Sequence, residues 1–521
     1  MPQAGRYRVF TPNPRSSRWA PQLKEHRARL RASHINQGTS IPRSQLRFPK
    51  ASGSVFRHPK LRVSEERGEA TAYGGLSLAT TLVRSLGVQR ALDEALSLLQ
   101  SHRPFTESDH VLTHVYNLFV GGTCLEDIGH LQASEPVRRM LGAVRIPDPT
   151  TAGDFLRRFD EQSLGILDGA IDAGQEAVWR RRYGRKKADR AIVDLDSHVH
   201  PVYGDQKEGA DFSYQGPLAY HPLVISLAQT QECLRLINRP GNTPSAEGAE
   251  AHLEELFPWL LRRFREVVVR GDSAFCNQKI FDACEAHRQH FAVVSPAQSN
   301  FEALADALPE SAWKPYRGPG ERARSAQRPS RRRRRRPNLR RRLARQRGKH
   351  DLKLERQWVA EIPYRPERSR QTYRLVIRRQ RIEEHQQGEL FELWRYRYVM
   401  TNLPPSTSTR GVVDLTYQRC DQENIIEQLQ HGIAGMRMPT GELLSNAAFL
   451  TCARLAHNLK AWLAQLALPR ETMRWEWKRF RHAFVYVAAR VLRQSRQIHV
   501  RIAASHRTAL TIVQAHARLQ I

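Results

Sequence analysis

The sequence has few cysteines and lacks long apolar runs. Its six cysteines are scattered along 521 residues, and no two of them form a CxxC pair. No apolar run approaches the ~20 residues that a membrane-spanning helix needs, and the opening segment lacks the apolar core of a secretory signal. These absences argue against a disulfide scaffold, a structural zinc site and a membrane protein, and they predict a protein of the reducing cytoplasm.

Acidic residues are fewer than basic residues in this sequence. The 52 Asp and Glu face 83 Lys and Arg, so the formal net charge is +31. Residues 1–62 hold 14 basic residues and one acid, and residues 317–349 hold 16 basic residues and one acid. The second segment contains an unbroken run made of Arg331, Arg332, Arg333, Arg334, Arg335 and Arg336.

Such a run repels itself unless a polyanion neutralises it, so we expect the arginine run to bind nucleic-acid phosphates. A solvated linker without a specific role is the alternative. The arginines alone do not tell RNA from DNA.

Periodicity predicts an α/β protein built from several segments. Helical spacing of apolar residues dominates before residue 185, and strands alternate with helices between 190 and 295 in the order β-β-β-α-β-α-β. The predicted segments are a basic, disordered arm (1–70), a helical domain (71–185), an α/β segment (186–300), an Arg-rich and β-rich insertion (301–404), a second helical segment (405–466) and a basic C-terminal region (467–521).

Three acids stand where a metal site would need them. Asp196 ends the first predicted strand, Asp272 ends the fourth, and Glu423 lies near the start of a later helix. Ends of adjacent strands lie within about 5 Å of one another. Two carboxylates so placed repel unless a cation lies between them, and Mg²⁺ prefers such hard oxygen ligands.

Other readings of the first strand stay open. Asp194 alternates with Asp196 and points to the same face, so either could serve the site. His198 and His200 follow on that face, and they suggest zinc, although no third ligand stands at a sensible spacing. Acids at strand ends also cap helices or simply face water.

The acids of the later helix are equally ambiguous. Arg419, Glu423 and Glu427 follow one another at four-residue spacing, which is most often a surface salt-bridge ladder. Spacing alone does not choose between the two glutamates.

Longer stretches around these acids carry more information than the acids themselves. They are VDLDSHVHPVYG continuing through HPLVISLAQT to NRPGN (193–242), then VVVRGDSAF (267–275), then YQRCDQENIIEQL (417–429). In this order and spacing they resemble the DDE transposases of bacterial insertion sequences. The resemblance is to DDE domain group 1, the relatives of insertion sequence thirteen-eighty, and it covers about 72–521.

The resemblance implies a fold and a set of ligands. The fold is a ribonuclease H-like (retroviral-integrase-like) catalytic core, made of 186–300 and 405–466, with a β-rich insertion and an N-terminal helical domain that binds DNA. The family's three acids fall on Asp196, Asp272 and Glu423, which favours Glu423 over Glu427. Together they would bind two Mg²⁺ ions, with Mn²⁺ as a substitute.

The resemblance also implies an activity. The enzyme would cleave transposon ends and join the 3′-OH to target DNA by two-metal phosphoryl transfer. Arg419 would contact a phosphate near the cleaved end, because a guanidinium matches phosphate geometry. The implied partners are the terminal inverted repeats and target DNA, held by a homodimer on paired ends at the bacterial nucleoid.

The sequence departs from the family pattern at several positions. Ser197 and His198 follow the first acid where Thr is usual, Gln430 stands where the related signature has Lys, and Tyr417 lies two rather than three residues before Arg419. These changes concern the handling of the 5′ phosphate and the DNA terminus. Two alternative functions follow, a Mg²⁺-dependent nuclease without strand transfer and a catalytically degenerate DNA-binding protein.

Overall fold

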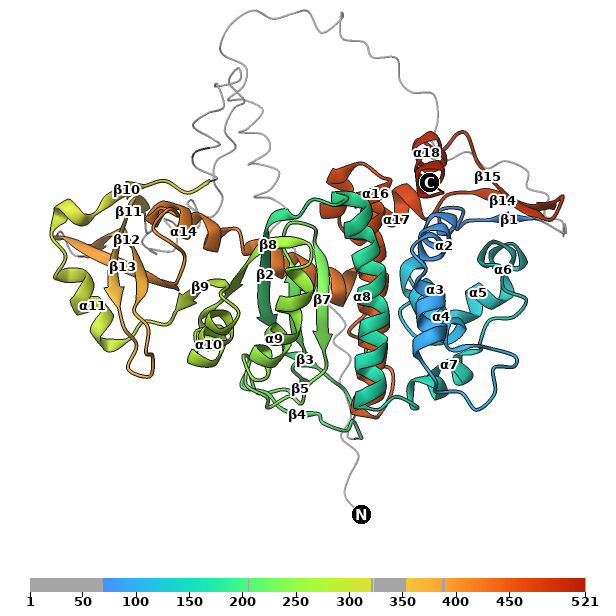
Figure 1. Ribbon diagram of the computed structural model, residues 1–521, viewed down its shortest axis with the longest axis horizontal. Helices are drawn as coiled ribbons and strands as arrows, with labels where there is room; N and C mark the ends of the chain where they lie inside the picture. Colours follow the sequence, from blue (N-terminus) through green and yellow to red (C-terminus); the bar gives the residue numbers. More distant parts are fainter. Residues whose placement is uncertain (1–68, 205, 320–321, 323–352, 387–388, 521) are drawn as a thin grey trace, which may run out of the picture. The chain divides into compact units, whose positions relative to one another are not determined.

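A computed structural model describes residues 69–204, 206–319, 322, 353–386 and 389–520 (Figure 1). The predicted N-terminal arm, up to residue 68, and the arginine run from Arg331 to Arg336 lie outside the described residues. Within the described ranges, no helix is both long and apolar enough to cross a membrane.

The described part of the chain contains a mixed sheet of nine strands, here called the central sheet, in the order β10-β11-β12-β13-β9-β8-β2-β6-β7. Strands β2, β8 and β9 are parallel to one another, and the other neighbouring pairs are antiparallel. The strands are β2 (Ala188–Ser197), β6 (Leu223–Leu227), β7 (Glu232–Ile237), β8 (Phe264–Gly271), β9 (His290–Ser295), β10 (Lys314–Tyr316), β11 (Lys353–Tyr364), β12 (Tyr373–Gln386) and β13 (Glu389–Thr401).

The predicted order of strands and helices between 190 and 295 is confirmed for the central sheet, but it missed a small sheet of β3 (His200–Pro201), β4 (Asp211–Phe212) and β5 (Leu218–Tyr220) between β2 and β6. The apolar run of β8, Val267 to Val269, is fully buried, as expected for a central strand covered on both faces. Helix α9 (Ala249–Leu260) connects β7 to β8, and α10 (Gln278–Ala286) connects β8 to β9. Asn277 caps α10 by accepting a hydrogen bond from the backbone N–H of Ile280 at 3.0 Å. The two crossovers therefore bring the ends of β2 and β8 to one edge.

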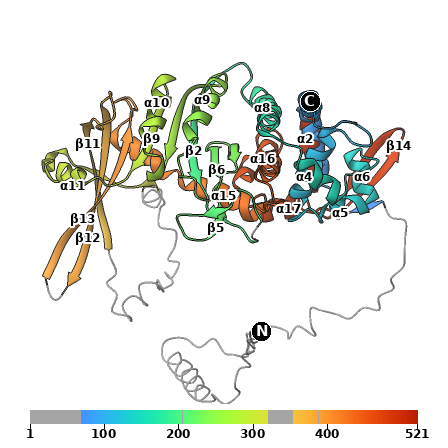
Figure 2. The same ribbon diagram turned by 90° about the horizontal axis from the view of Figure 1, so that it is seen from below.

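Strands β10 to β13 are the insertion, and they extend the central sheet because β13 pairs with β9. Figure 2 shows β12 and β13 as a long hairpin. The buried guanidinium of Arg379 lies 4.2 Å from the ring centre of Trp313 and 4.4 Å from that of Trp394, and it also pairs with Glu310. This cation–π contact ties the hairpin to the segment before β10.

Helices pack beside the β7 edge of the sheet. Helices α8 and α16 contact each other, α16 also contacts β7 and α4, and the shorter helices lie beyond them (Figure 1). The helices are α2 (Leu76–Ser85), α3 (Val88–Ala95), α4 (Glu107–Val120), α5 (Ile128–Ala133), α6 (Glu135–Leu141), α7 (Pro149–Leu156), α8 (Glu161–Tyr183) and α16 (Leu443–Leu466). One hydrophobic cluster joins residues from 76 to 178 with residues from 425 to 519. The predicted boundaries at 185 and 466 stay predictions, and the packing crosses both.

The C-terminal region completes this helical layer. It consists of α17 (Trp477–Phe484), β14 (Ala489–Gln494), β15 (Gln497–Ile502) and α18 (Ala509–Leu519). Strand β14 pairs with β1 (Ala70–Thr71), which lies more than 400 residues away in sequence. Such a long-range pairing leaves no local pattern from which it could be predicted.

A buried ion network fastens α16 to the sheet. The guanidinium of Arg454 is fully buried, pairs with Asp168 and Asp172 on α8, and donates to the carbonyl oxygen of Cys233 at 3.2 Å. Arg235 on β7 binds the other oxygen of Asp172 at 2.8 Å. Each charge in the network has a partner, so removal of one leaves another uncompensated.

We therefore predict that Arg454→Met lowers the free energy of unfolding by about 3–5 kcal/mol, because Asp168 and Asp172 lose their shared cation inside the protein. Urea denaturation followed by fluorescence measures the change. The control is Arg90→Met, which removes an exposed pair with Glu94. Equal losses in the two variants would contradict a structural role for the buried network.

Candidate functional site

Two of the predicted acids meet at the edge where β2 and β8 end. Asp196 is the penultimate residue of β2, and Asp272 directly follows β8. The parallel register pairs Asp194 with Arg270. Asp196 and Asp272, each two residues further along its strand direction, therefore lie at the same level. Backbone N–H groups orient them, since Ser197 donates to Asp196 and Ala274 donates to Asp272, each at 2.9 Å.

Arg419 lies between these carboxylates. Its Nη2 is 2.9 Å from Oδ2 of Asp196 and 3.8 Å from Oδ2 of Asp272. The side chains of Arg419 and Asp196 are largely buried, at 16% and 15% exposure, whereas Asp272 is 44% exposed. Arg419 directly precedes helix α15 (Cys420–Glu427), so the helix that carries the third predicted acid is anchored to the strand ends.

The one positive charge of Arg419 does not balance the negative charges of the acids around it. Burial raises the pKa of Asp196 to about 6, the charge of Arg419 opposes this rise, and the negative charges of Asp272 and Glu423 add to it. The carboxylates therefore repel one another, and an additional cation would relieve that repulsion.

Glu423 lies on the exposed side of α15. Its charge acts on Asp196, but no three His, Cys, Asp or Glu side chains of the described residues are grouped closely enough to hold a metal ion. Glu427 is also exposed, and Gln430 lies in a π-helical turn, Gln428–Gly432. Neither makes a side-chain hydrogen bond or ion pair with another described residue. The assignment of Glu423 as the third acid stays a prediction.

Asp194 has a structural partner. Its two carboxylate oxygens accept hydrogen bonds from Nε and Nη2 of Arg270, both at 2.6 Å, and both side chains are at most 1% exposed. Arg270 also donates to the carbonyl oxygen of Leu415 at 2.6 Å, in helix α14 (Thr409–Tyr417). This pair joins β2, β8 and α14 directly beneath the acids. The sequence did not predict the partner of Asp194.

The histidines after β2 do not complete a zinc site within the described residues. The rings of His198 and His200 are 6.1 Å apart between centroids, and no third ligand joins them. Burial lowers the pKa of His200 to about 4, with the charge of His198 adding to the effect, so the ring is neutral at pH 7.

Tyr417 faces the insertion. Its ring stacks on that of Tyr316 at 6.2 Å between centroids, and the guanidinium of Arg378 lies 4.7 Å above its centre. Two residues later the chain reaches Arg419, which faces Asp196. The two sides of this short segment therefore contact different parts of the central sheet.

The acids open into a cleft of about 720 Å³. Asp196 and Asp272 lie at one side, and Tyr214, Lys279 and Arg368 are among the other lining residues. Tyr214 is 76% exposed. The sequence pattern did not single out these three residues, because nothing local distinguishes them from ordinary surface side chains.

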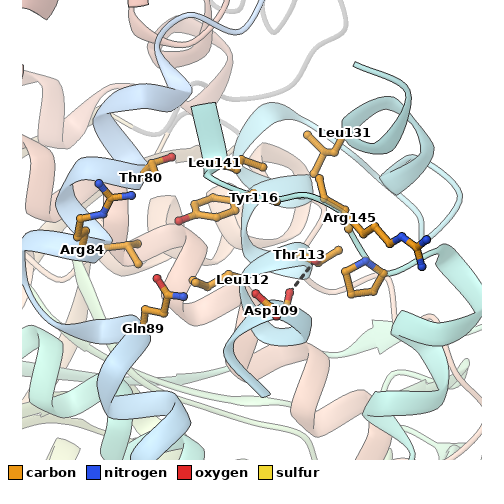
Figure 3. A pocket seen from close by; sticks show the side chains of 14 residues that line it. Thr80, Arg84, Gln89, Asp109, Leu112, Thr113, Tyr116, Leu131, Leu141 and Arg145 are labelled. Atoms are coloured by element: carbon orange, nitrogen blue, oxygen red, sulfur yellow. Dashed lines mark hydrogen bonds between the residues drawn. The ribbon is translucent and has the colours of Figure 1, made fainter. Parts of the chain in front are cut away.

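A separate pocket lies among the N-terminal helices (Figure 3). It is lined by Thr80, Arg84, Tyr116 and Asp109, among others, and its volume is about 60 Å³. Asp109 accepts a hydrogen bond from the backbone N–H of Thr106 at 2.9 Å, as part of the cap of α4. The carboxylate of Asp109 therefore stabilises the start of helix α4.

A family model described as transposase DDE domain group 1 matches residues 54–521. Among solved structures, a cryo-EM structure of the piggyBac transposase synaptic complex with hairpin DNA is similar at 12% sequence identity. That similarity covers 80% of this chain and 84% of the other, with a TM-score of 0.27. No curated protein sequence matches the chain. The family match, which spans most of the chain, carries the assignment.

The two aspartates of β2 should respond in opposite ways to removal of their charge. We predict that Asp194→Asn lowers the free energy of unfolding by about 3–5 kcal/mol, because Arg270 is left buried and unpaired. Asp196→Asn should not lower it. The folded-state pKa of Asp196 is raised, so its ionised form opposes folding above pH 6, and that penalty disappears as pH falls below 4.

Urea denaturation at pH 7.5 without divalent metal measures both variants. A larger loss for Asp196→Asn than for Asp194→Asn would contradict this division of roles.

Proposed function

Because the chain belongs to the transposase DDE domain group 1 family, and so is a DDE-type transposase, we propose that it cuts the ends of an insertion sequence and joins them to target DNA. The part of the central sheet from β7 to β9 would be a ribonuclease H-like core. Its strand order, β7-β6-β2-β8-β9, supports this, since antiparallel strands β2, β6 and β7 are followed by two parallel crossovers.

The shared guanidinium is the observation that carries the proposal. Asp196 and Asp272 come from different strands and converge on one atom of Arg419, at 2.9 and 3.8 Å. Unlike the carboxylates around the buried Arg454, these two are open to a ligand, since Asp272 is 44% exposed and both acids line the cleft. Two carboxylates around one cation form a site that favours positive charge, as phosphoryl-transfer sites do.

The residues present fit a magnesium site. Mg²⁺ is usually bound by one or two carboxylates, waters and substrate phosphates rather than by a complete protein cage. Asp196 and Asp272 would supply these carboxylates, and Glu423 would complete the set when DNA is bound. Two Mg²⁺ or Mn²⁺ ions would then activate the attacking oxygen and stabilise the leaving one.

The other side chains position the chemistry. The Asp194–Arg270 pair and its bond to Leu415 hold α14 against β2 and β8, and so fix the point from which Arg419 reaches the acids. Arg419 would bind a phosphate of the cleaved end, for which a guanidinium is well shaped.

The partners follow from this activity. The substrates would be terminal inverted repeats and target DNA, with the helical segment 71–185 reading the repeats and the arginine run adding sequence-independent affinity. The enzyme would act as a homodimer on paired ends, at the nucleoid of a bacterial cell.

We predict that Asp272→Asn lowers the rate of Mg²⁺-dependent end cleavage at least about a thousandfold, because the pair that binds the cation is broken. DNA affinity should stay near that of the wild type, since Asp272 contributes no positive charge. Cleavage of a labelled duplex that carries the element's end measures the rate, and anisotropy measures the affinity.

Cleavage at the wild-type rate would contradict the assignment of Asp272. Incubation with a circular target separates a transposase from a nuclease, because only a transposase gives strand-transfer products.

The two glutamates of α15 provide a matched pair. Glu423→Gln should abolish cleavage, because the negative charge of Glu423 reaches Asp196 and raises its pKa. Glu427 lies one helical turn further, so Glu427→Gln should leave the cleavage rate within about threefold of the wild-type rate. Both residues are exposed, so neither variant should disturb folding. The reverse result in the same cleavage assay would move the third acid to Glu427.

A further inference from the structure

A second pocket on the central sheet is lined by two arginines on neighbouring strands. Its volume is about 90 Å³, and Arg378, Arg397 and Tyr417 line it together with the side chains of Val376 and Val399. No acidic residue lines it. The inference drawn from this pocket rests on the proposed function, because it concerns where DNA is held.

The strand register forces the two positive charges together. Arg378 on β12 is directly opposite Arg397 on β13, and Arg395 lies two residues along β13 on the same face. Like charges directly opposite each other in a sheet destabilise it. Burial, together with the charges of Arg397 and Arg395, lowers the pKa of Arg378 to about 10.

No acidic side chain of the described residues pairs with these charges, and Arg378 has the ring of Tyr417 beside it. Arg378 donates to Oε1 of Gln357 at 3.4 Å, but none of Arg378, Arg395 and Arg397 forms an ion pair with another described residue. The acid of α14, Asp414, is engaged, because it accepts hydrogen bonds from the hydroxyl of Tyr316 at 2.8 Å and from Arg322 at 2.7 Å. The opposite face of β12 differs, since Arg379 there has both a carboxylate and aromatic partners.

The pocket and the acids lie on the same face of the sheet. Val399 of β13 packs in one cluster with Val268 of β8, and Ile192 of β2 contacts that cluster. Side chains two residues apart on a strand share a face, so Asp196 lies on the face of Ile192 and Arg397 on that of Val399.

The two sites also lie close together along the strands, since the register makes Asp272 level with Val399, two residues from Arg397. Gly271, the residue before Asp272, pairs with Val293 of β9, and Val293 pairs with Met400 of β13. Three strand spacings separate β13 from β2, which is about 15 Å and well within one ~34 Å turn of duplex DNA.

We propose that Arg378 and Arg397 form a phosphate-binding pocket for the backbone of the DNA whose scissile bond lies at Asp196 and Asp272. The bound phosphodiester supplies the negative charge that the described residues around the pocket lack. Arg395 extends the contact along β13. The insertion thus holds the DNA through the folded surface of its sheet, at a defined distance from the acids.

The test is a salt titration of DNA binding. Fluorescence anisotropy of a labelled duplex is measured with the full chain, without divalent metal, over a series of KCl concentrations. Arg397→Gln should raise Kd about tenfold and reduce the slope of log K against log salt by about one, because one phosphate contact is lost. Arg397 is exposed, and loss of its charge relieves repulsion, so the melting temperature should not fall.

Arg90→Gln is the matched control, since it removes the same charge from an exposed helix and should leave the slope unchanged. An unchanged slope for Arg397→Gln would overturn the proposal. Stabilisation by inorganic phosphate that needs Arg397, with DNA binding unaffected, would also overturn it and assign the pocket to free phosphate. The cleavage rate of Asp272→Asn tests the proposed function, and the salt dependence of DNA binding tests this pocket. The two proposals can therefore fail independently.

Discussion

The mutual repulsion of Asp196 and Asp272 is the constraint on which the rest of the site depends. Two parallel crossovers place these carboxylates at the ends of adjacent strands. Ionisation of both costs free energy there unless a cation lies near them. Arg419 meets part of that need, but burial, with the charges of Asp272 and Glu423 adding to it, still raises the pKa of Asp196 to about 6. The fold therefore holds a site that gains free energy from additional positive charge, which is the property a metal-dependent phosphoryl transferase requires.

The same face of the sheet shows the opposite imbalance three strands away. There Arg378 and Arg397 repel each other, and no described acid compensates them. Cations bound to the carboxylates and a polyanion bound to the arginines would relieve the repulsion within each group. A DNA strand across this face would supply the polyanion, and metal ions held between its phosphates and the acids would supply the cations. The Asp194–Arg270 pair lies beneath and is fully satisfied, so it can hold the scaffold while the charges above it change partners.

Much of the core could be predicted from the sequence, because its signals are local. The apolar run before Asp272 predicted a central strand, and the alternation before Asp196 predicted its neighbour. Long-range partners could not be predicted this way. The partner of Asp194 is Arg270, on another strand, and the pairing of β14 with β1 joins the two ends of the described chain. The choice of Glu423 over Glu427 came from the family resemblance, since both are exposed on the same helix.

The most direct test of the account is a titration of the full chain with Mn²⁺, followed by electron paramagnetic resonance. We expect the wild type to bind the ion, and Asp196→Asn and Asp272→Asn each to weaken this binding at least about tenfold, because each removes a carboxylate ligand. Equal Mn²⁺ affinity in the wild type and in both variants would contradict the claim that these two carboxylates form a cation site.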